Sequence, residues 1–268
     1  MLKAEPPGVE GTGRRAGEPD LRHRYTADDL RVLTPGEAAR FLPGSGGDPR
    51  TDMVLAWELL YRLEPELYDR LAAAERLHPG IRDWLPRGVG RIAETGAGTG
   101  RLTLELIGRA REIVAVEPAA PLRRILTRKL SEAEHGDQVR VIPGFFDSLP
   151  LPDDFADLVV ACSAFTPAPG HGGQAGLSEM ERVCRPGGCV AIVWPNNLDW
   201  LAARGYRYAS FPGPMSAEFT SYEEAAELAG IFFPRAAGEV RRRGERRVPF
   251  EVLGINPPRD VAFKVLGR

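Results

Sequence analysis

Three carboxylates and a glycine-rich stretch are the residues best suited to chemistry in this sequence. Glu94 stands just before three glycines at alternate positions, Gly96, Gly98 and Gly100. Glycine has no Cβ, so a turn built from it lets a ligand come close to the backbone. Glu117 and Asp147 each follow a later apolar run. These residues predict a nucleotide-like ligand, but a glycine turn alone does not say which one.

The acids indicate the charge of that ligand. Glu117 comes 23 positions after Glu94, a spacing at which a carboxylate reaches ribose hydroxyls, in NAD sites as well. A carboxylate at about 5 Å from a unit charge, at an effective dielectric near 20, interacts with it by roughly 3 kcal/mol. That interaction attracts a sulfonium or ammonium group and repels a pyrophosphate. Asp147 can accept a hydrogen bond from the adenine amine. The acids therefore favour a cationic adenosine derivative, the alternative being solvated acids at strand ends.

The elements that must position these residues follow from the apolar pattern. Short β-branched runs predict strands at 90–94, 112–116, 138–142, 156–162 and 188–194. Longer periodic stretches between them predict helices at 100–110, 119–134 and 174–185. Such alternation is typical of a parallel sheet covered on both faces. In that sheet all three acids lie at the carboxyl edge, where ligands of this architecture bind.

The flanking segments predict further elements. Helical periodicity begins near Thr51 and runs to Leu77, with a break near Pro65. Ser221, with Glu224 three residues later, predicts a helix to about residue 229. Residues 247–253 and 260–266 resemble two strands joined by the turn at 256–259. A C-terminal antiparallel hairpin is unlike a dinucleotide-binding domain, which normally ends on another parallel strand.

Residues 1–50 are rich in Gly, Pro, Arg and acids. Such a composition buries little apolar surface, so we expect a flexible tail, or a lid that orders over ligand. A short helix is expected around Pro35 to Leu42, with Thr34 as its cap. Residues 51–268 are expected to form one α/β domain.

Composition disfavours several classes of protein. The 268 residues carry a formal net charge of −2, whereas proteins that bind nucleic-acid backbones are usually basic. No stretch reaches the roughly 18 apolar residues of a membrane-spanning helix. The three cysteines fit neither a disulfide framework nor a paired metal-ligand spacing, and free thiols suit a reducing compartment. We expect a cytoplasmic protein without a membrane or metal site.

Several stretches then resemble one family in the family's order. Residues 94–100, Glu-Thr-Gly-Ala-Gly-Thr-Gly, resemble motif I of class I S-adenosylmethionine-dependent methyltransferases. Val116-Glu117-Pro118 is similar to the ribose-binding acid that follows. Residues 144–153 resemble the stretch that holds adenine, 155–160 the fourth strand, and 181–188 the glycine turn before the fifth strand. The resemblance covers about residues 88 to 195 and the closing hairpin. It implies a Rossmann-like three-layer α/β sandwich with a mostly parallel seven-stranded sheet and a C-terminal antiparallel hairpin.

The resemblance also implies S-adenosyl-L-methionine as the cofactor. Its methionine end would lie over the glycine turn, Glu117 would take the ribose, and Ser163 would face the methyl group. Phe146 and Asp147 would hold adenine, with Pro118 packed on its face. The implied cofactor-binding residues are Glu94, Thr95, Gly96, Ala97, Gly98, Gly100, Glu117, Pro118, Phe146, Asp147 and Ser163.

Catalytic residues stay unknown, because the family shares no universal catalytic group. His171 is a candidate base or a solvated loop residue, and His23 with Tyr25 could belong to a lid. The residues after the fifth strand either line an acceptor pocket or pack an ordinary helix; they are Trp194, Asn196, Asn197, Trp200, Tyr206 and Tyr208. The arginine run at 241–247 either touches phosphates or forms a charged edge strand or loop.

We therefore expect methyl transfer to a small-molecule acceptor, which the sequence does not identify. The alternatives are an RNA or protein methyltransferase of the same fold, a nicotinamide-dependent oxidoreductase, and a binding protein that keeps the ligand without turnover. The sequence does not determine the oligomeric state.

Overall fold

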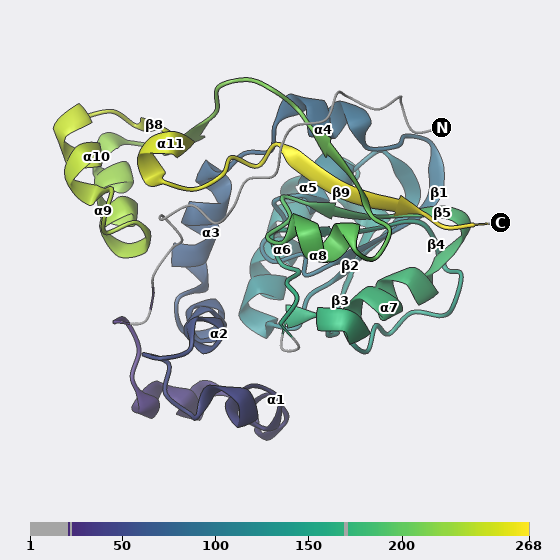
Figure 1. Ribbon diagram of the computed structural model, residues 1–268, viewed down its shortest axis with the longest axis horizontal. Helices are drawn as coiled ribbons and strands as arrows, with labels where there is room; N and C mark the ends of the chain where they lie inside the picture. Colours follow the sequence, from purple (N-terminus) through teal and green to yellow (C-terminus); the bar gives the residue numbers. More distant parts are fainter. Residues whose placement is uncertain (1–20, 22, 169–170, 268) are drawn as a thin grey trace. The chain divides into compact units, whose positions relative to one another are not determined.

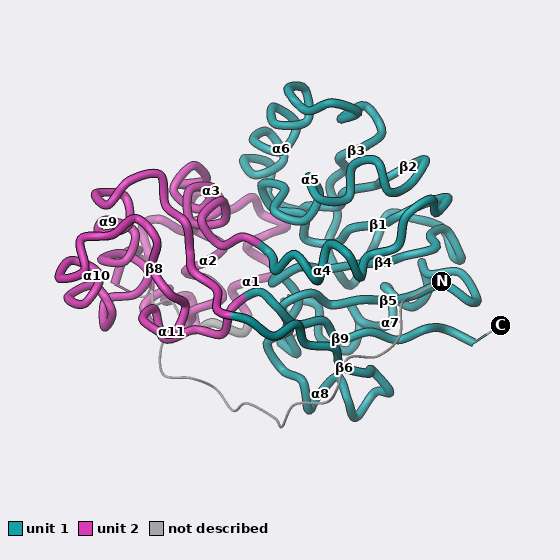
Figure 2. Tube along the Cα trace, turned by 90° about the horizontal axis from the view of Figure 1, so that it is seen from above, with its two compact units in different colours: residues 1–11, 77–213, 258–268 teal, residues 12–76, 214–257 magenta. Residues whose placement is uncertain are grey.

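The computed structural model describes residues 21, 23–168 and 171–267, which fall into two compact units (Figure 2). Unit 1 contains the described residues of Leu77–Gly213 and Pro258–Arg268. Unit 2 contains those of Thr12–Arg76 and Pro214–Pro257. The chain therefore enters unit 2 twice, once before the sheet begins and once between its last two strands.

Unit 1 is built on a seven-stranded sheet in the order β3-β2-β1-β4-β5-β9-β6 (Figure 1). Strands β1 to β5 run parallel, and β9 lies antiparallel between β5 and β6. The strands are β1 Val89–Thr95, β2 Ala110–Val116, β3 Val139–Ile142, β4 Ala156–Cys162, β5 Cys184–Val193, β6 Arg207–Ser210 and β9 Asp260–Val265. The mostly parallel seven-stranded sheet expected from the sequence is confirmed.

Helices cover both faces of this sheet, which makes three layers. The helices of unit 1 are α4 Pro79–Trp84, α5 Thr103–Leu106, α6 Ala120–Glu132, α7 Gly173–Val183 and α8 Leu198–Ala202, with the 3-10 turn η2 Gly136–Gln138. Side chains of β2 alternate between the layers: Ile113 and Ala115 face α4, α5 and α6, whereas Val114 and Val116 face α7 and α8. This alternation follows from the two-residue period of a strand.

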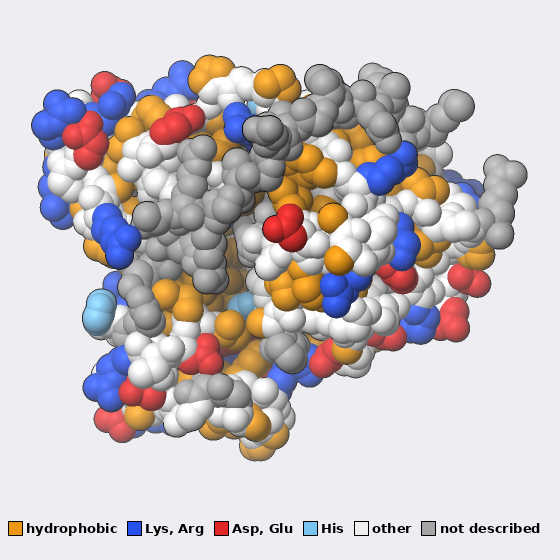
Figure 3. Space-filling view, viewed as in Figure 1, with side chains coloured by type: hydrophobic (Ala, Val, Ile, Leu, Met, Phe, Trp, Pro, Cys, Tyr) orange, Lys and Arg blue, Asp and Glu red, His pale blue; other side chains and the backbone are white. Residues whose placement is uncertain are grey.

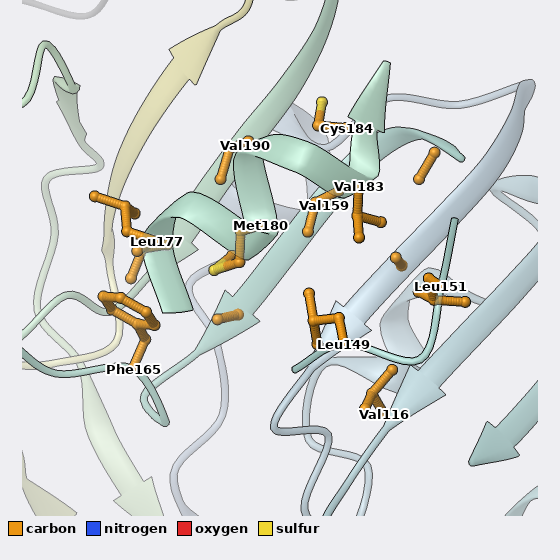
Figure 4. Packing of buried hydrophobic residues seen from close by; sticks show 14 of the residues in the cluster. Val116, Leu149, Leu151, Val159, Phe165, Leu177, Met180, Val183, Cys184 and Val190 are labelled. Atoms are coloured by element: carbon orange, nitrogen blue, oxygen red, sulfur yellow. The ribbon is translucent and has the colours of Figure 1, made fainter. Parts of the chain in front are cut away.

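Helix α7 packs on the sheet through Leu177, Met180 and Val183, which Figure 4 shows directed toward β4 and β5. The spacing of three residues brings these side chains to one side of the helix. All three are at most 1% exposed. Burying each of them contributes about 1.5–3 kcal/mol, so α7 is held mainly by this apolar contact.

The strand register aligns the carboxyl ends of four neighbouring strands. Thr95 pairs with Val116 on one side and with Ala161 on the other, and Val116 pairs with Ile142. The loops that follow β1, β2, β3 and β4 therefore begin at almost the same level. Any ligand at this edge meets all four loops.

Unit 2 is mainly helical and has its own buried side chains. Its elements are η1 Ala27–Val32, α1 Pro35–Ser45, α2 Met53–Leu63, α3 Pro65–Ala74, β7 Ser216–Glu218, α9 Tyr222–Phe232, α10 Ala237–Arg243, β8 Arg247–Pro249 and α11 Phe250–Leu253. Trp57 of α2 stacks on Phe232 of α9 at 6.0 Å between ring centroids. Strands β7 and β8 form a separate antiparallel pair.

Several local expectations in unit 2 are confirmed. Thr34 accepts a hydrogen bond from Glu37 N, and Pro35 begins α1. The break near Pro65 is the junction of α2 and α3. Ser221 caps α9 through Glu224 N, although α9 continues to Phe232. How residues 1–50 behave, as a tail or a lid, and the assignment of residues 51–268 to one domain stay predictions.

Two expectations about helices and strands need correction. The helix expected at 100–110 is limited to Thr103–Leu106, because the glycine turn continues to residue 102 and β2 begins at Ala110. Residues 247–253 do not pair with 260–266: they form β8 and α11, and β9 pairs with β5 and β6 instead. An apolar run shows that a strand is buried, but it does not show which strand is its neighbour.

Candidate functional site

The glycine turn leaves the end of β1 and folds back on β2. Backbone N–H groups of Gly96 and Ala97 donate to Val116 O at 2.8 and 3.1 Å. Gly96 has φ +69°, and a Cβ there would lie 2.6 Å from Ala164 Cβ and 2.9 Å from the Phe146 ring. Glycine is therefore required at this position by both backbone conformation and space. The side chains of Ala164 and Phe146 are the groups that lie this close to Gly96 in the structure.

Glu94 lies beneath this turn and is almost completely buried, with 1% of its surface exposed. The Thr103 hydroxyl, from α5, donates to its Oε2 at 2.6 Å. Burial raises the pKa of Glu94 to about 8, the Thr103 hydrogen bond opposes that rise, and the charge of Glu117 adds to it. A positive charge nearby would favour the ionised form of Glu94.

Glu117 follows β2 and is also buried, at 4% exposure. Its Oε2 accepts from Gly98 N at 2.9 Å, and its Oε1 accepts from Ala119 N at 2.8 Å. The carboxylate therefore links the glycine turn to the segment that begins α6. Because each carboxylate oxygen has further lone pairs, Glu117 can still accept hydrogen bonds from a ligand.

Two buried hydroxyls in the same turn are unsatisfied. Thr95 Oγ1 and Thr99 Oγ1 have no hydrogen-bond partner among the residues that the structure describes. A buried polar atom left without a partner costs about 1–3 kcal/mol, so such atoms often mark a ligand site. Sequence reasoning selected Thr95 but missed Thr99. The signal was available, because Thr99 stands between Gly98 and Gly100.

Phe146 and Asp147 lie on the loop after β3, which α7 holds in place. The Phe146 ring meets the Phe165 ring edge-on at 5.4 Å, and Asp147 is half-buried. Arg182 of α7 donates to Leu149 O at 3.2 Å and to Leu151 O at 2.9 Å. The structure thus brings Phe146 over Gly96 and places Asp147 on the same loop.

Ser163 and Trp194, at the ends of β4 and β5, both have φ +53°. A left-handed backbone is unfavourable for a bulky side chain such as Trp, and strain of this kind clusters at functional sites. Ser163 N donates to Val193 O, and the Arg101 guanidinium lies 5.2 Å from the centre of the Trp194 ring. Arg101 lies near the end of the glycine turn, and sequence reasoning did not select it.

The other candidates after β5 have contacts of an ordinary packed segment. Asn197 caps α8 by accepting from Trp200 N at 3.0 Å. The Tyr206 hydroxyl donates to Glu181 at 3.2 Å, and Arg204 stacks on the Trp200 ring at 3.8 Å. These contacts support the packing alternative for Asn197, Trp200 and Tyr206. Tyr208 is half-buried, and burial raises its pKa to about 12.

The remaining candidates are distributed between the units. His171 is half-buried in unit 1, and its carbonyl accepts from Thr166 N at 2.9 Å. His23 and Tyr25 belong to unit 2, where the Tyr25 hydroxyl donates to Glu64 at 2.8 Å. Burial raises the pKa of Tyr25, and the hydrogen bond to Glu64 raises it further. A lid role for His23 and Tyr25 stays a prediction.

The arginine run at 241–247 spans the end of α10 and the first residue of β8. Figure 3 shows Lys and Arg side chains over α10 with acidic side chains among them. Arg242 pairs with Glu239 at 2.6 Å, and Arg247 pairs with Glu218 at 2.9 Å. These pairs support the interpretation of the run as a charged surface.

The middle of unit 1 is similar to known methyltransferases. Residues 92–188 match the family model for a methyltransferase domain. An uncharacterized methyltransferase of Mycobacterium tuberculosis is 32% identical over 134 residues, which cover 47% of this chain and 50% of that protein. One of Geobacillus kaustophilus is 29% identical over 102 residues, 38% of this chain and 45% of that protein. This chain thus spans about half the length of the curated relatives that it matches.

Residues 92–188 contain β1, the glycine turn and the loops after β2, β3 and β4. This part of the chain is therefore similar to a methyltransferase domain. A solved SAM dependent methyltransferase from Aquifex aeolicus is 16% identical, with a TM-score of 0.44, and covers 58% of this chain and 93% of its own. The candidate cofactor-binding residues, from Glu94 to Ser163, lie inside the matched residues.

The described residues contain no group of three His, Cys, Asp or Glu side chains placed to hold a metal ion. None of the described helices has the length and apolar character to cross a membrane.

Proposed function

We propose that this protein transfers a methyl group from S-adenosylmethionine to a small-molecule acceptor. One observation carries the proposal: two buried carboxyl groups, Glu94 and Glu117, lie close together at the glycine turn. A pyrophosphate placed there would meet two acids in a poorly hydrated site, and the interaction would be repulsive. A ligand with a sulfonium and an ammonium group relieves the same repulsion.

The residues around the turn fit such a cofactor. The unsatisfied hydroxyls of Thr95 and Thr99 offer hydrogen bonds to its polar atoms. Glu117 is held by Gly98 N and Ala119 N in a position to receive the ribose hydroxyls. Glu94, whose ionised form a bound cation favours, would then supply negative charge beneath the turn. Phe146 and Asp147 would hold adenine, and Pro118 would pack on its face.

The chain's own residues have a positioning task. The bound sulfonium supplies an activated methyl group, so the protein must align an acceptor and exclude water. Ser163, at the end of β4, would face the methyl group. Trp194 and Arg101 lie beside it and would form the acceptor side of the site. A general base is needed where the acceptor loses a proton, and His171 remains a candidate for that role.

Two features support a small acceptor and this cofactor. The formal net charge of −2 disfavours a nucleic-acid backbone as the acceptor. The antiparallel position of β9 differs from the parallel strand with which a nicotinamide-binding domain normally ends.

Calorimetry tests the proposal with S-adenosylhomocysteine and NAD as the titrants. We expect micromolar binding of S-adenosylhomocysteine and about 10- to 100-fold weaker binding for Glu117→Ala, because that variant loses charge-assisted hydrogen bonds to ribose. Glu134→Ala is the matched control, since the Glu134 side chain is 90% exposed. Binding of NAD in place of S-adenosylhomocysteine would refute the assignment. Incubating a metabolite extract with a labelled methyl donor then identifies the acceptor.

A further inference from the structure

Arg123 of α6 binds the carbonyls of two consecutive peptide groups, Glu117–Pro118 and Pro118–Ala119. Its Nη1 donates to Glu117 O and to Pro118 O, both at 2.7 Å. The two carbonyls belong to consecutive residues, so one guanidinium nitrogen fixes the orientation of both peptide planes. We call these two hydrogen bonds the Arg123 clamp. The clamp holds the backbone segment that carries the Glu117 side chain.

The position of this arginine is unusual for a helix. Arg123 is the fourth residue of α6, and a cation in the first turn opposes the helix dipole. The two hydrogen bonds to carbonyls and the nearby Glu117 carboxylate offset that cost. Arg124, the next residue of the same helix, is exposed and offers a matched comparison.

The clamp and the carboxylate contacts form one connected arrangement. Glu117 Oε1 accepts from Ala119 N, so the carboxylate is bound to the segment whose carbonyls Arg123 holds. Glu117 Oε2 accepts from Gly98 N, which ties the same carboxylate to the glycine turn. If the peptide planes at 117 and 118 rotate, the Ala119 N–H moves and the carboxylate loses one of its two anchors.

We propose that Arg123 is a positioning residue that presents the Glu117 carboxylate to the ribose hydroxyls of the cofactor. This inference rests on the proposed function and adds a residue that does not itself touch the cofactor. Arg123 acts through two backbone carbonyls. Its loss should therefore weaken recognition of the ribose hydroxyls more than recognition of the rest of the ligand.

The experiment compares two ligands, S-adenosylhomocysteine and its 2′-deoxy analogue, by calorimetry. The wild-type protein should prefer the hydroxylated ligand, because Glu117 hydrogen-bonds the hydroxyl. In Arg123→Met the affinity for S-adenosylhomocysteine should fall about 10-fold or more. The ratio of the affinities for the two ligands should fall toward one. Arg124→Met should retain the wild-type values. Arg123→Lys should restore most of the preference, because an ammonium group can donate to both carbonyls.

The outcomes separate this inference from the proposed function. A stability change in Arg123→Met with an unchanged preference would show a merely structural role and overturn the inference. If Arg123→Met does not fold, Arg123→Gln gives the same comparison with one donor group. Equal binding of both ligands by the wild-type protein also overturns it. Binding of NADP in place of S-adenosylhomocysteine would refute the proposed function itself. Arg123 would then be a residue that binds the 2′-phosphate of NADP.

Discussion

Glu94 and Glu117 are both glutamates at the ends of neighbouring strands, but their hydrogen-bond partners differ. Glu94 accepts a hydrogen bond from the Thr103 hydroxyl and is 1% exposed. Glu117 accepts from two backbone N–H groups, which stabilise its carboxylate form. Environments that differ in this way let one site contain a neutral carboxyl group beside a charged one. Ligand binding and pH should therefore act mainly through Glu94.

Stability should fall with rising pH because of Glu94. Burial raises its pKa from 4.5 to about 8, so the folded protein keeps a proton that the unfolded chain releases between these values. The contribution of Glu94 is complete below about pH 4.5 and is lost as pH rises through 8. Glu94→Gln should remove this dependence, which is worth a few kcal/mol, and should make the protein relatively more stable at pH 8.

Thermal unfolding at pH 5, 6.5 and 8 measures the effect without ligand. The quantity of interest is the difference between wild type and Glu94→Gln at each pH, since other groups titrate in both proteins. Glu134→Gln, at an exposed position, should follow the wild-type curve. A constant difference across the three pH values would mean that Glu94 is already ionised in the folded protein.

Helix α7 supports the loop that follows β3. Its apolar side packs on the sheet, and its Arg182 binds the carbonyls of Leu149 and Leu151. Arg182 also pairs with Glu179 and Asp153, both at 2.7 Å. The loop with Phe146 and Asp147 thus depends on a helix that begins 26 residues after Asp147.

Arg182→Met should destabilise unit 1 by about 1–3 kcal/mol, because two carbonyls lose a charged donor. The amides of Leu149, Leu151 and Asp153 should exchange hydrogen faster than those of β1. Urea unfolding and hydrogen exchange by mass spectrometry measure the two effects. Arg128→Met, at an exposed position of α6, provides the control. Unaltered exchange in the loop would show that α7 packing alone holds it.

At the scale of the whole molecule, each unit has its own core. Unit 1 buries aliphatic side chains on both faces of the sheet. Unit 2 contains the stacked Trp57 and Phe232 and a buried ion-pair group on α2. In that group Arg62 pairs with Glu58 and Glu37, both at 2.6 Å, and its side chain is 4% exposed.

Arg62→Met should therefore destabilise unit 2 first. The variant leaves Glu58 buried without its cation, a change that costs about 3–5 kcal/mol in comparable pairs. Hydrogen exchange should increase in α1 and α2 while the strands β1 and β4 keep their protection. Arg31→Met, exposed in η1, should leave both patterns unchanged. A uniform increase across both units would show instead that they unfold together.

The sequence by itself determined the five parallel strands, the edge at which the acids lie and the glycine at position 96. These features depend on local patterns: the apolar runs, the residues that end them, and a backbone conformation that glycine adopts easily. The caps at Thr34 and Ser221 belong to the same class, because a cap is made within four residues.

Tertiary structure decided the rest. It paired β9 with β5 and β6, limited α5 to four residues, and divided the chain into two units. It also brought the Thr103 hydroxyl to Glu94 and the Arg123 guanidinium to the carbonyls of residues 117 and 118. In the same way it brought Arg182 to the loop that follows β3. Each of these depends on which surfaces meet in three dimensions. Residue type and local spacing do not encode that, since a polar side chain has many partners within reach and packing selects among them.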